Sequence, residues 1–194
     1  MIEIPRPVAA DPIQWERRWL GDPGPPPRLF CGAGDFSLKS PRRRPCTSEI
    51  EHVMSGFTPS SPFSFRVTPH VTAGELAKGQ EARRFQLQHQ CDTAVLLCQF
   101  MEQVRAHFGG KPLIIDSGYR PPAVNRSVGG ASKSEHLYND RDIGAVDFHV
   151  GNVSVYLVQD YCDKHWPYSI GYGAAKGFVH LGMRKGRPRV RWNY

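Results

Sequence analysis

The stretch SEHLYNDRDIGAVDFH, residues 134–149, places two histidines, four acidic residues and one serine within sixteen positions. Its second half leads into IGAVDFHV, residues 143–150, where apolar and polar side chains alternate. Such alternation predicts a β-strand, because successive side chains of a strand point to opposite faces of the sheet. One face of this strand is apolar, and Asp147 and His149 lie together on the other. The apolar side chains are Val146, Phe148 and Val150.

Further helices and strands are predicted on both sides of this strand. Asp92 is a favourable N-cap for a helix with one apolar stripe that ends at Gly109. Thr72 and Glu75 form a capping box for a short helix that ends at Gly79. The other expected elements are a strand at 111–116, a short helix at 121–127, a helix at 154–166 and strands at 178–183 and 189–192. This irregular order of helices and strands favours an α+β fold over a doubly wound sheet.

Proline sets the N-terminal third of the chain apart. Twelve of the 17 prolines lie within residues 1–69, a density that disfavours long helices and central strands. We therefore expect an irregular, proline-rich extended arm at 1–68, with one short helix near 11–20, and a folded domain at 69–194. The arm is rich in phenylalanine and tryptophan, which are scarce in disordered segments, so we expect it to pack against something else, such as neighbouring subunits of a larger assembly.

The chain is basic, with a formal net charge of +7 and local clusters at 40–45 (SPRRRP) and 184–191 (RKGRPRVR). Such charge favours anionic partners, and it is equally compatible with a solvated basic surface. The candidate anionic partners are a cell-wall polymer, nucleic acid and an acidic neighbouring subunit. No nucleic-acid-binding motif accompanies the basic residues, so we do not expect nucleic acid as a partner.

Neither a membrane span nor a disulfide framework is indicated. No apolar run approaches the roughly 20 residues needed to cross a bilayer, and the N-terminal sequence lacks the basic start and apolar core of a signal peptide. The five cysteines are an odd number and form no CxxC pair. Cys98 is expected to be a buried free thiol, and Cys31 and Cys46 are the plausible disulfide partners.

Two histidines and one aspartate form a candidate metal site. In the predicted strand FVHLGM, residues 178–183, His180 shares a face with Gly182. Together with His136 and Asp147 it offers two imidazoles and one carboxylate, which leaves the fourth tetrahedral position open, as in catalytic zinc sites. The spacing alone also fits an ordinary hydrogen-bonded histidine–aspartate pair.

Four separated motifs resemble one known family. These are SGYRPPAVNRSVGG at 117–130, the Ser134 and His136 pair, AVDF at 145–148 and FVHLGMRKGRPRVRW at 178–192. Together they resemble the zinc D-Ala-D-Ala carboxypeptidase family, the peptidoglycan peptidases of the hedgehog/DD-peptidase fold, over about residues 70–192. The resemblance implies an antiparallel sheet with flanking helices and a zinc-dependent peptidase.

Carried over position by position, the resemblance implies zinc ligands at His136, Asp147 and His180. Arg120 matches the arginine that anchors the substrate, and a guanidinium suits a peptide carboxylate; the alternative is a structural arginine. Ser134 matches a position that contacts the substrate or orients the site, and it is otherwise a turn serine. A closing tryptophan, at position 192, is expected in the core.

The sequence departs from the family pattern in three places. Eleven positions separate His136 from Asp147, which is longer than the family spacing. The positions that usually supply the general base are Gly177 and Phe178, and neither can accept a proton. Gly182 stands two positions after His180, where relatives closest to this pattern often have an aspartate. The candidates to stand in for the missing base are Glu135, Asp140, Asp142 and His149.

These motifs predict a zinc metallopeptidase that hydrolyses an amide bond in peptidoglycan stem peptides, as a D-Ala-D-Ala carboxypeptidase or an endopeptidase. The alternative is a catalytically weak or inactive member that serves as a structural or cell-wall-binding component, for example of a phage tail or baseplate. A third hypothesis is a binder of anionic polymers. Without a leader peptide, the protein would act at the bacterial cell wall or in the periplasm after delivery by another route, for instance in a virion.

Overall fold

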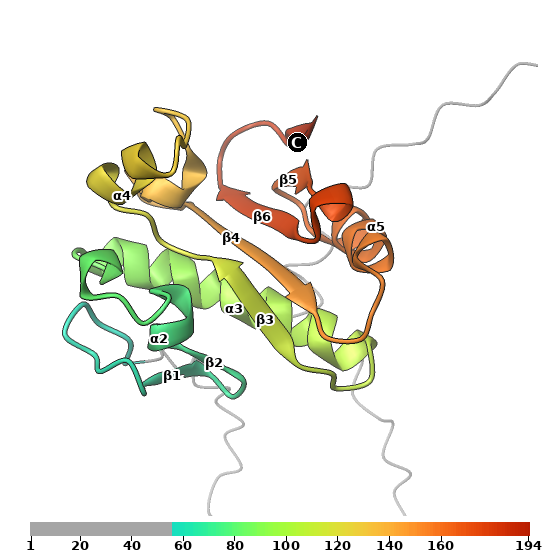
Figure 1. The fold of residues 1–194 in the computed structure, drawn as a ribbon, viewed down its shortest axis with the longest axis horizontal. Coiled ribbons are helices and arrows are strands. Elements are labelled where there is room, and N and C mark those ends of the chain that lie inside the picture. Colours follow the sequence, from blue (N-terminus) through green and yellow to red (C-terminus); the bar gives the residue numbers. More distant parts are fainter. Residues whose placement is uncertain (1–55) are drawn as a thin grey trace, which may run out of the picture. The chain divides into compact units, whose positions relative to one another are not determined.

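A five-stranded sheet in the order β3-β4-β6-β5-β7 is the frame of residues 56–194, the part of the chain that the computed structural model describes (Figure 1). Neighbouring strands run antiparallel, except that β7 pairs with β5 in parallel. β6 already pairs with β4 and β5, so the returning chain pairs with the free edge of β5. β5 and β7 both run opposite to β6, and they are therefore parallel to each other. The strands are β3 (Leu113–Ser117), β4 (Ile143–Val150), β5 (Ser169–Tyr172), β6 (Val179–Arg184) and β7 (Arg191–Asn193).

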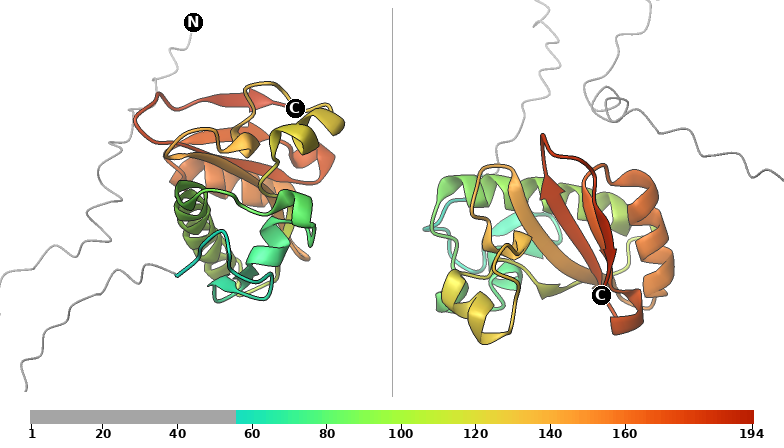
Figure 2. Two further views of the ribbon diagram at one scale, coloured as in Figure 1. Left: turned by 90° about the vertical axis from the view of Figure 1, so that its left-hand side faces the viewer. Right: turned by 90° about the horizontal axis from the view of Figure 1, so that it is seen from above.

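Helix α3 (Gln88–His107) lies behind β3 and β4 in the view of Figure 1, and α5 (Val155–His165) packs beside β5 and β6. The two further views in Figure 2 show α3 along one face of the sheet. The remaining elements are β1 (Arg66–Thr68), β2 (Val71–Thr72), α2 (Ala73–Leu76), α4 (Pro122–Ser127) and the 3-10 helices η1 (Glu81–Arg83), η2 (Glu135–Leu137) and η3 (Ala174–Lys176). The described residues are therefore α+β, as the sequence predicts.

The core lies between α3, α5 and one face of the sheet. The predicted apolar face of β4 is confirmed, because Val146, Phe148 and Val150 are all buried in one cluster with side chains of both helices. Cys98 of α3 is a buried free thiol, as expected. The opposite face of the sheet is left for the polar residues of β4 and β6. None of the described helices is long and apolar enough to cross a membrane.

Helix α3 begins earlier than the sequence predicts. Asp92 is not its N-cap but lies inside the helix, where it accepts a hydrogen bond from Gln88 Nε2 at 2.9 Å. The chain enters the helix at Leu87, and Gln90 Oε1 accepts from the backbone N–H groups of Gln86 and Leu87 at 3.0 and 3.1 Å. Here a glutamine inside the first turn accepts from the backbone N–H groups that precede the helix. This arrangement has no sequence signature comparable to that of an N-cap aspartate.

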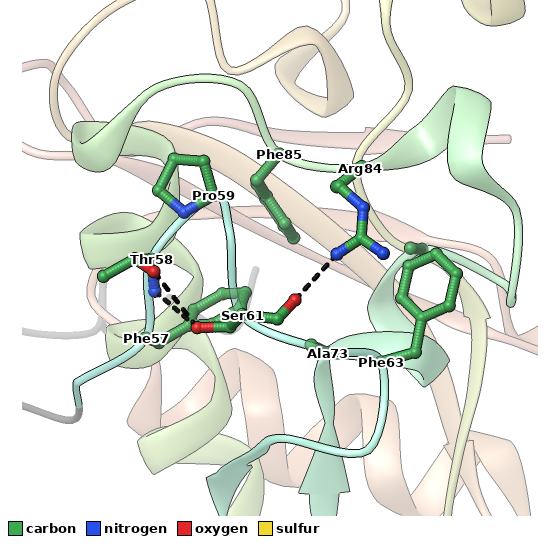
Figure 3. Close-up of a pocket in the computed structure, with 9 residues that line it drawn as sticks. Phe57, Thr58, Pro59, Ser61, Phe63, Ala73, Arg84 and Phe85 are labelled. Atoms are coloured by element: carbon green, nitrogen blue, oxygen red, sulfur yellow. Dashed lines mark hydrogen bonds between the residues drawn. The ribbon is translucent and has the colours of Figure 1, made fainter.

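Residues 56–68 pack with the domain. Phe57 is buried in the core cluster and meets Phe85 edge-on, with 5.5 Å between the ring centroids. Figure 3 shows Arg84 donating from Nη1 to the Ser61 carbonyl at 2.7 Å, across a small pocket that none of the candidate metal ligands lines. The folded unit therefore extends N-terminal to residue 69. The rest of the predicted arm, with its short helix and the Cys31 and Cys46 pair, lies outside the described residues.

Candidate metal centre

His136, Asp147 and His180 meet on the face of the sheet opposite the helices. One ligand atom from each residue lies within 4.8 Å of the other two, and all three side chains are buried. His136 comes from η2, and the other two come from adjacent strands. In the register of β4 and β6, Asp147 lies directly opposite His180. The sheet itself therefore sets the distance between two of the three residues.

The contacts of His136 fix which ring nitrogen faces the cluster. Its Nδ1 lies 2.8 Å from the carbonyl oxygen of Gly118, which can only accept, so Nδ1 carries the proton and donates. Burial lowers the pKa of His136, which keeps the ring neutral. Nε2 then presents a lone pair 3.0 Å from Oδ2 of Asp147, and it makes no hydrogen bond to any described residue.

This arrangement fits a bound cation. A lone pair and a carboxylate oxygen repel each other at 3.0 Å, and a metal ion between them turns that repulsion into two ligand bonds. The donor set of imidazole nitrogens and a carboxylate oxygen suits zinc among the divalent metals. The hydrogen bond from His136 to Gly118 is the kind of outer contact that orients a metal-binding histidine.

Asp147 is held as an anion. Burial by itself raises the pKa of its carboxyl, but the polar contact with His180 is among those that outweigh burial and hold the pKa well below its usual range. Its two oxygens are divided between the two histidines, with Oδ1 2.7 Å from His180 Nδ1. A single carboxylate thus connects both imidazoles.

The His180 ring lies between two carboxylates. Nδ1 faces Asp147, and Nε2 faces Glu135 Oε2 at 3.2 Å. Burial lowers the pKa of His180, but the contacts with these two acids outweigh burial and raise it. The hydroxyl of Tyr194 also lies 3.1 Å from Nδ1. From the sequence, Glu135 is only one of four candidate bases, and Tyr194 is not singled out.

Ser134 and Arg120 hold the turn that carries His136. The Ser134 side chain accepts from the backbone N–H of His136 at 3.3 Å, as the N-cap of η2. The backbone N–H of Arg120 donates to the His136 carbonyl at 2.8 Å. Both residues therefore contact the backbone of His136.

The long spacing from His136 to Asp147 is accommodated by one buried anchor. Tyr138 has a left-handed backbone, with φ of 50°, and its hydroxyl donates to the Ala145 carbonyl at 3.0 Å. A Cβ on Gly144 would come within 2.4 Å of the Tyr138 ring, so glycine is needed there. The exposed residues 139–141 lie in the loop beyond this contact, and the extra length leaves the strand register intact.

Of the four proposed stand-ins for the missing base, Glu135 is the one that touches the cluster within residues 56–194. His149 Nδ1 is instead paired with Asp116 at 2.8 Å. Asp140 is mostly exposed and lies 3.7 Å from Arg187. Asp142 has a left-handed backbone, and its carbonyl accepts from the Lys185 N–H.

Arg120 is a half-buried cation beside the cluster. Its Nε is buried and makes no hydrogen bond to any described residue. Burial lowers the pKa of its guanidinium, and the charge of Asp147 opposes that shift; an arginine nevertheless stays charged in proteins. Arg83, which the sequence analysis did not single out, adds a second nearby positive charge and also has a buried Nε without a described partner.

Trp192 does not belong to the core, contrary to the sequence prediction. It is half-buried on the edge strand β7, and its ring lies over His180 with 5.0 Å between the centroids. The parallel return of β7 beside β5 produces this position, because it places Trp192 next to Gly171, which pairs with His180 on its other side. Trp192 and Tyr194 therefore border the cluster.

The comparisons agree with the motifs. No curated protein matches the chain. A family model described as Peptidase M15 matches residues 69–182, more than half of the 194 residues. The match spans all three residues of the cluster as well as Arg120 and Ser134. The chain therefore belongs to the M15 peptidases, the family of the zinc D-Ala-D-Ala carboxypeptidases.

Proposed function

We propose that the protein is a zinc metallopeptidase that hydrolyses an amide bond in peptidoglycan stem peptides, as a D-Ala-D-Ala carboxypeptidase or an endopeptidase. The observation that carries the proposal is the buried His136 Nε2 lone pair, which faces an ionised Asp147 with no proton between them. Membership of the M15 peptidases supplies the reaction class.

Each residue of the centre has a distinct task in this proposal. His136, Asp147 and His180 would hold Zn²⁺, which supplies Lewis-acid polarisation of the scissile carbonyl when it is bound. The sheet register and the hydrogen bond to Gly118 keep the ligands in place before the substrate arrives. The side chains of Trp192 and Tyr194 border this face and limit the access of water.

Arg120 would select the substrate through a carboxylate. Its buried Nε lacks a described partner, and a guanidinium donates two parallel hydrogen bonds to a carboxylate. Stem peptides offer carboxylates at their C-termini. A peptide whose carboxylate reaches Arg120 would place the amide bond next to it at the metal centre.

Replacing Arg120 by alanine should lower kcat/KM for a stem peptide with a free C-terminal carboxylate by about 10–100-fold, because hydrogen bonds to charged groups contribute about 1.5–3 kcal/mol. The measurement is kcat/KM for the free acid and for its C-terminal amide. The amide should already be a poor substrate of the unchanged enzyme and should lose little more in the variant. An equal loss on both peptides would mean that Arg120 acts only through the fold.

The function itself is tested with the purified full chain, loaded with Zn²⁺ and incubated with stem pentapeptide and with cross-linked wall fragments. We expect release of D-alanine or cleavage of the cross-link, loss of that activity with a chelator, and its return on adding Zn²⁺. The His180→Ala variant provides the background. Product release no greater than this background on both substrates would refute the proposal.

A second candidate function is supported by Gly177 and Phe178. Gly177 has a left-handed backbone with φ of 92°, and the Phe178 ring packs edge-on against Tyr194 at 5.1 Å, so neither offers a proton acceptor. We propose as the alternative a wall-binding or structural component, for example in a phage tail or baseplate, attached through residues 1–68. It predicts co-sedimentation with intact wall sacculi without any cleavage product. Full-chain protein that cleaves but is not retained on sacculi would exclude it.

A further inference from the structure

We propose that Glu135 is a positioning residue of the metal centre, whose carboxylate holds His180 through Nε2 and so leaves Nδ1 as the ligand atom. The inference rests on the proposed metal-binding function of His180. It assigns a task to a residue that precedes the first proposed ligand, His136, and that reaches the last one from the opposite side of the ring.

The two nitrogens of His180 point in different directions. Nδ1 lies 2.7 Å from Asp147 Oδ1, on the side where Asp147 also meets His136. Nε2 lies 3.2 Å from Glu135 Oε2. Each carboxylate can accept a hydrogen bond, so without a metal ion both ring nitrogens can carry a proton. A cation bound among the three residues would replace the proton of Nδ1, which faces the cluster, whereas Nε2 would keep its proton and donate to Glu135.

The Glu135 carboxylate is fixed in place. The Ser169 hydroxyl lies 2.9 Å from both carboxylate oxygens, and Arg184 Nε lies 3.3 Å from Oε1. The Glu135 side chain is only 11% exposed, and Ser169 is fully buried. With donors from β5 and β6 on one side and His180 on the other, this acid has the fixed contacts that an orienting carboxylate requires.

Gly182 provides the space for this carboxylate. It lies two residues after His180 on β6 and opposite Ser169 on β5. A Cβ at position 182 would come within 1.9 Å of Glu135 Oε2 and 2.4 Å of Ser169 Oγ. The Glu135 carboxylate in this position and any side chain at position 182 therefore exclude each other. Gly182, which departs from the family pattern, is the residue that leaves room for the Glu135 carboxylate beside His180.

This mutual exclusion gives a test by exchange. Glu135→Ala should weaken Zn²⁺ binding by about 10–100-fold, the usual effect of losing an orienting partner. Gly182→Asp alone should also weaken binding, because two acids then compete for one space. The double variant Glu135→Ala/Gly182→Asp should recover most of the affinity, since a carboxylate again faces Nε2. The matched control Glu135→Ala/Gly182→Ala fills the space without a carboxylate and should not recover it.

The readouts are Zn²⁺ affinity, measured by competition with a chromogenic chelator, and the ¹⁵N shifts of the His180 ring. Glu135→Gln, which preserves the shape, covers the case in which the alanine variants do not fold, and it should show an intermediate loss. Equal affinities for the two double variants, or single variants with unchanged affinity, would overturn the inference. Because binding is measured without a substrate, a chain that binds Zn²⁺ but cleaves nothing would contradict the proposed peptidase activity and leave the assignment of Glu135 intact. A chain that binds no Zn²⁺ would overturn both.

Discussion

Replacing Asp147 by asparagine should weaken Zn²⁺ binding by more than the roughly 100-fold that a lost orienting contact can cost, and should reduce stem-peptide hydrolysis to the His180→Ala background. Asp147 is the only anion among the three proposed ligands, and both of its oxygens are used, one toward each histidine. An amide supplies no charge and must turn its NH₂ group toward one of the two imidazoles. Metal content by elemental analysis and affinity by chelator competition measure the effect.

The chain supplies a matched control in Asp116→Asn. Asp116 on β3 forms a second aspartate–histidine pair on the same sheet, 2.8 Å from His149, but about a third of each side chain is exposed. Removing it should change stability by less than about 1 kcal/mol and leave Zn²⁺ affinity unchanged. If Asp116→Asn weakened Zn²⁺ binding as much as Asp147→Asn, the metal would not be bound where we propose.

The alternation of residues 143–150 was sufficient to predict both the strand and the face on which Asp147 lies, and β4 has those bounds. The same reasoning placed His180 on the matching face of its own strand. Neither pattern predicts the register between the two strands, because the register depends on the packing of the whole sheet. The structure adds that Asp147 and His180 are direct partners across the ladder.

Contacts that depend on how separate strands pair cannot be predicted from this sequence. From the sequence, Trp192 is expected in the core as the closing tryptophan of the family pattern, whereas the parallel pairing of β7 with β5 places it at the edge, beside His180. The short strand β5, which makes that pairing possible, has only four residues and includes a glycine, too little for a visible alternation. The pairing of β7 with β5 leaves no local trace in the sequence of either strand.

Glu135 shows a different limit. The sequence identified it as one of four candidates to compensate for Gly177 and Gly182, and nothing in the spacing ranked it above Asp140. Glu135 is distinguished by its surroundings in the folded chain. Its carboxylate occupies the space that a side chain at position 182 would fill, and Ser169 and Arg184 line that space as donors. Glu135 and Gly182 lie 47 positions apart in the chain, so no local sequence pattern links this acid to the space that it occupies.

Gly118→Ala should have the largest effect on stability, with a loss of about 3 kcal/mol or more in the free energy of unfolding, at the upper end of what overpacking causes. A Cβ on this residue would lie 2.2 Å from the carbonyl oxygen of Leu76 and 2.9 Å from its carbonyl carbon. These are backbone atoms at the end of α2, so no rotamer change relieves the contact. Urea unfolding in the presence of excess chelator isolates this effect from metal binding.

The same substitution should also impair the metal centre, because the Gly118 carbonyl accepts the hydrogen bond from His136 Nδ1. If the backbone shifts to admit the methyl group, that orienting contact lengthens, and Zn²⁺ affinity should fall by about 10–100-fold in whatever fraction remains folded. Gly151→Ala is the control: its nearest neighbours would lie at 3.6 Å or more, an ordinary contact distance, and it should change stability by no more than about 0.5 kcal/mol. A Gly118→Ala variant as stable as Gly151→Ala and with full Zn²⁺ affinity would show that α2 does not press on the turn that holds His136.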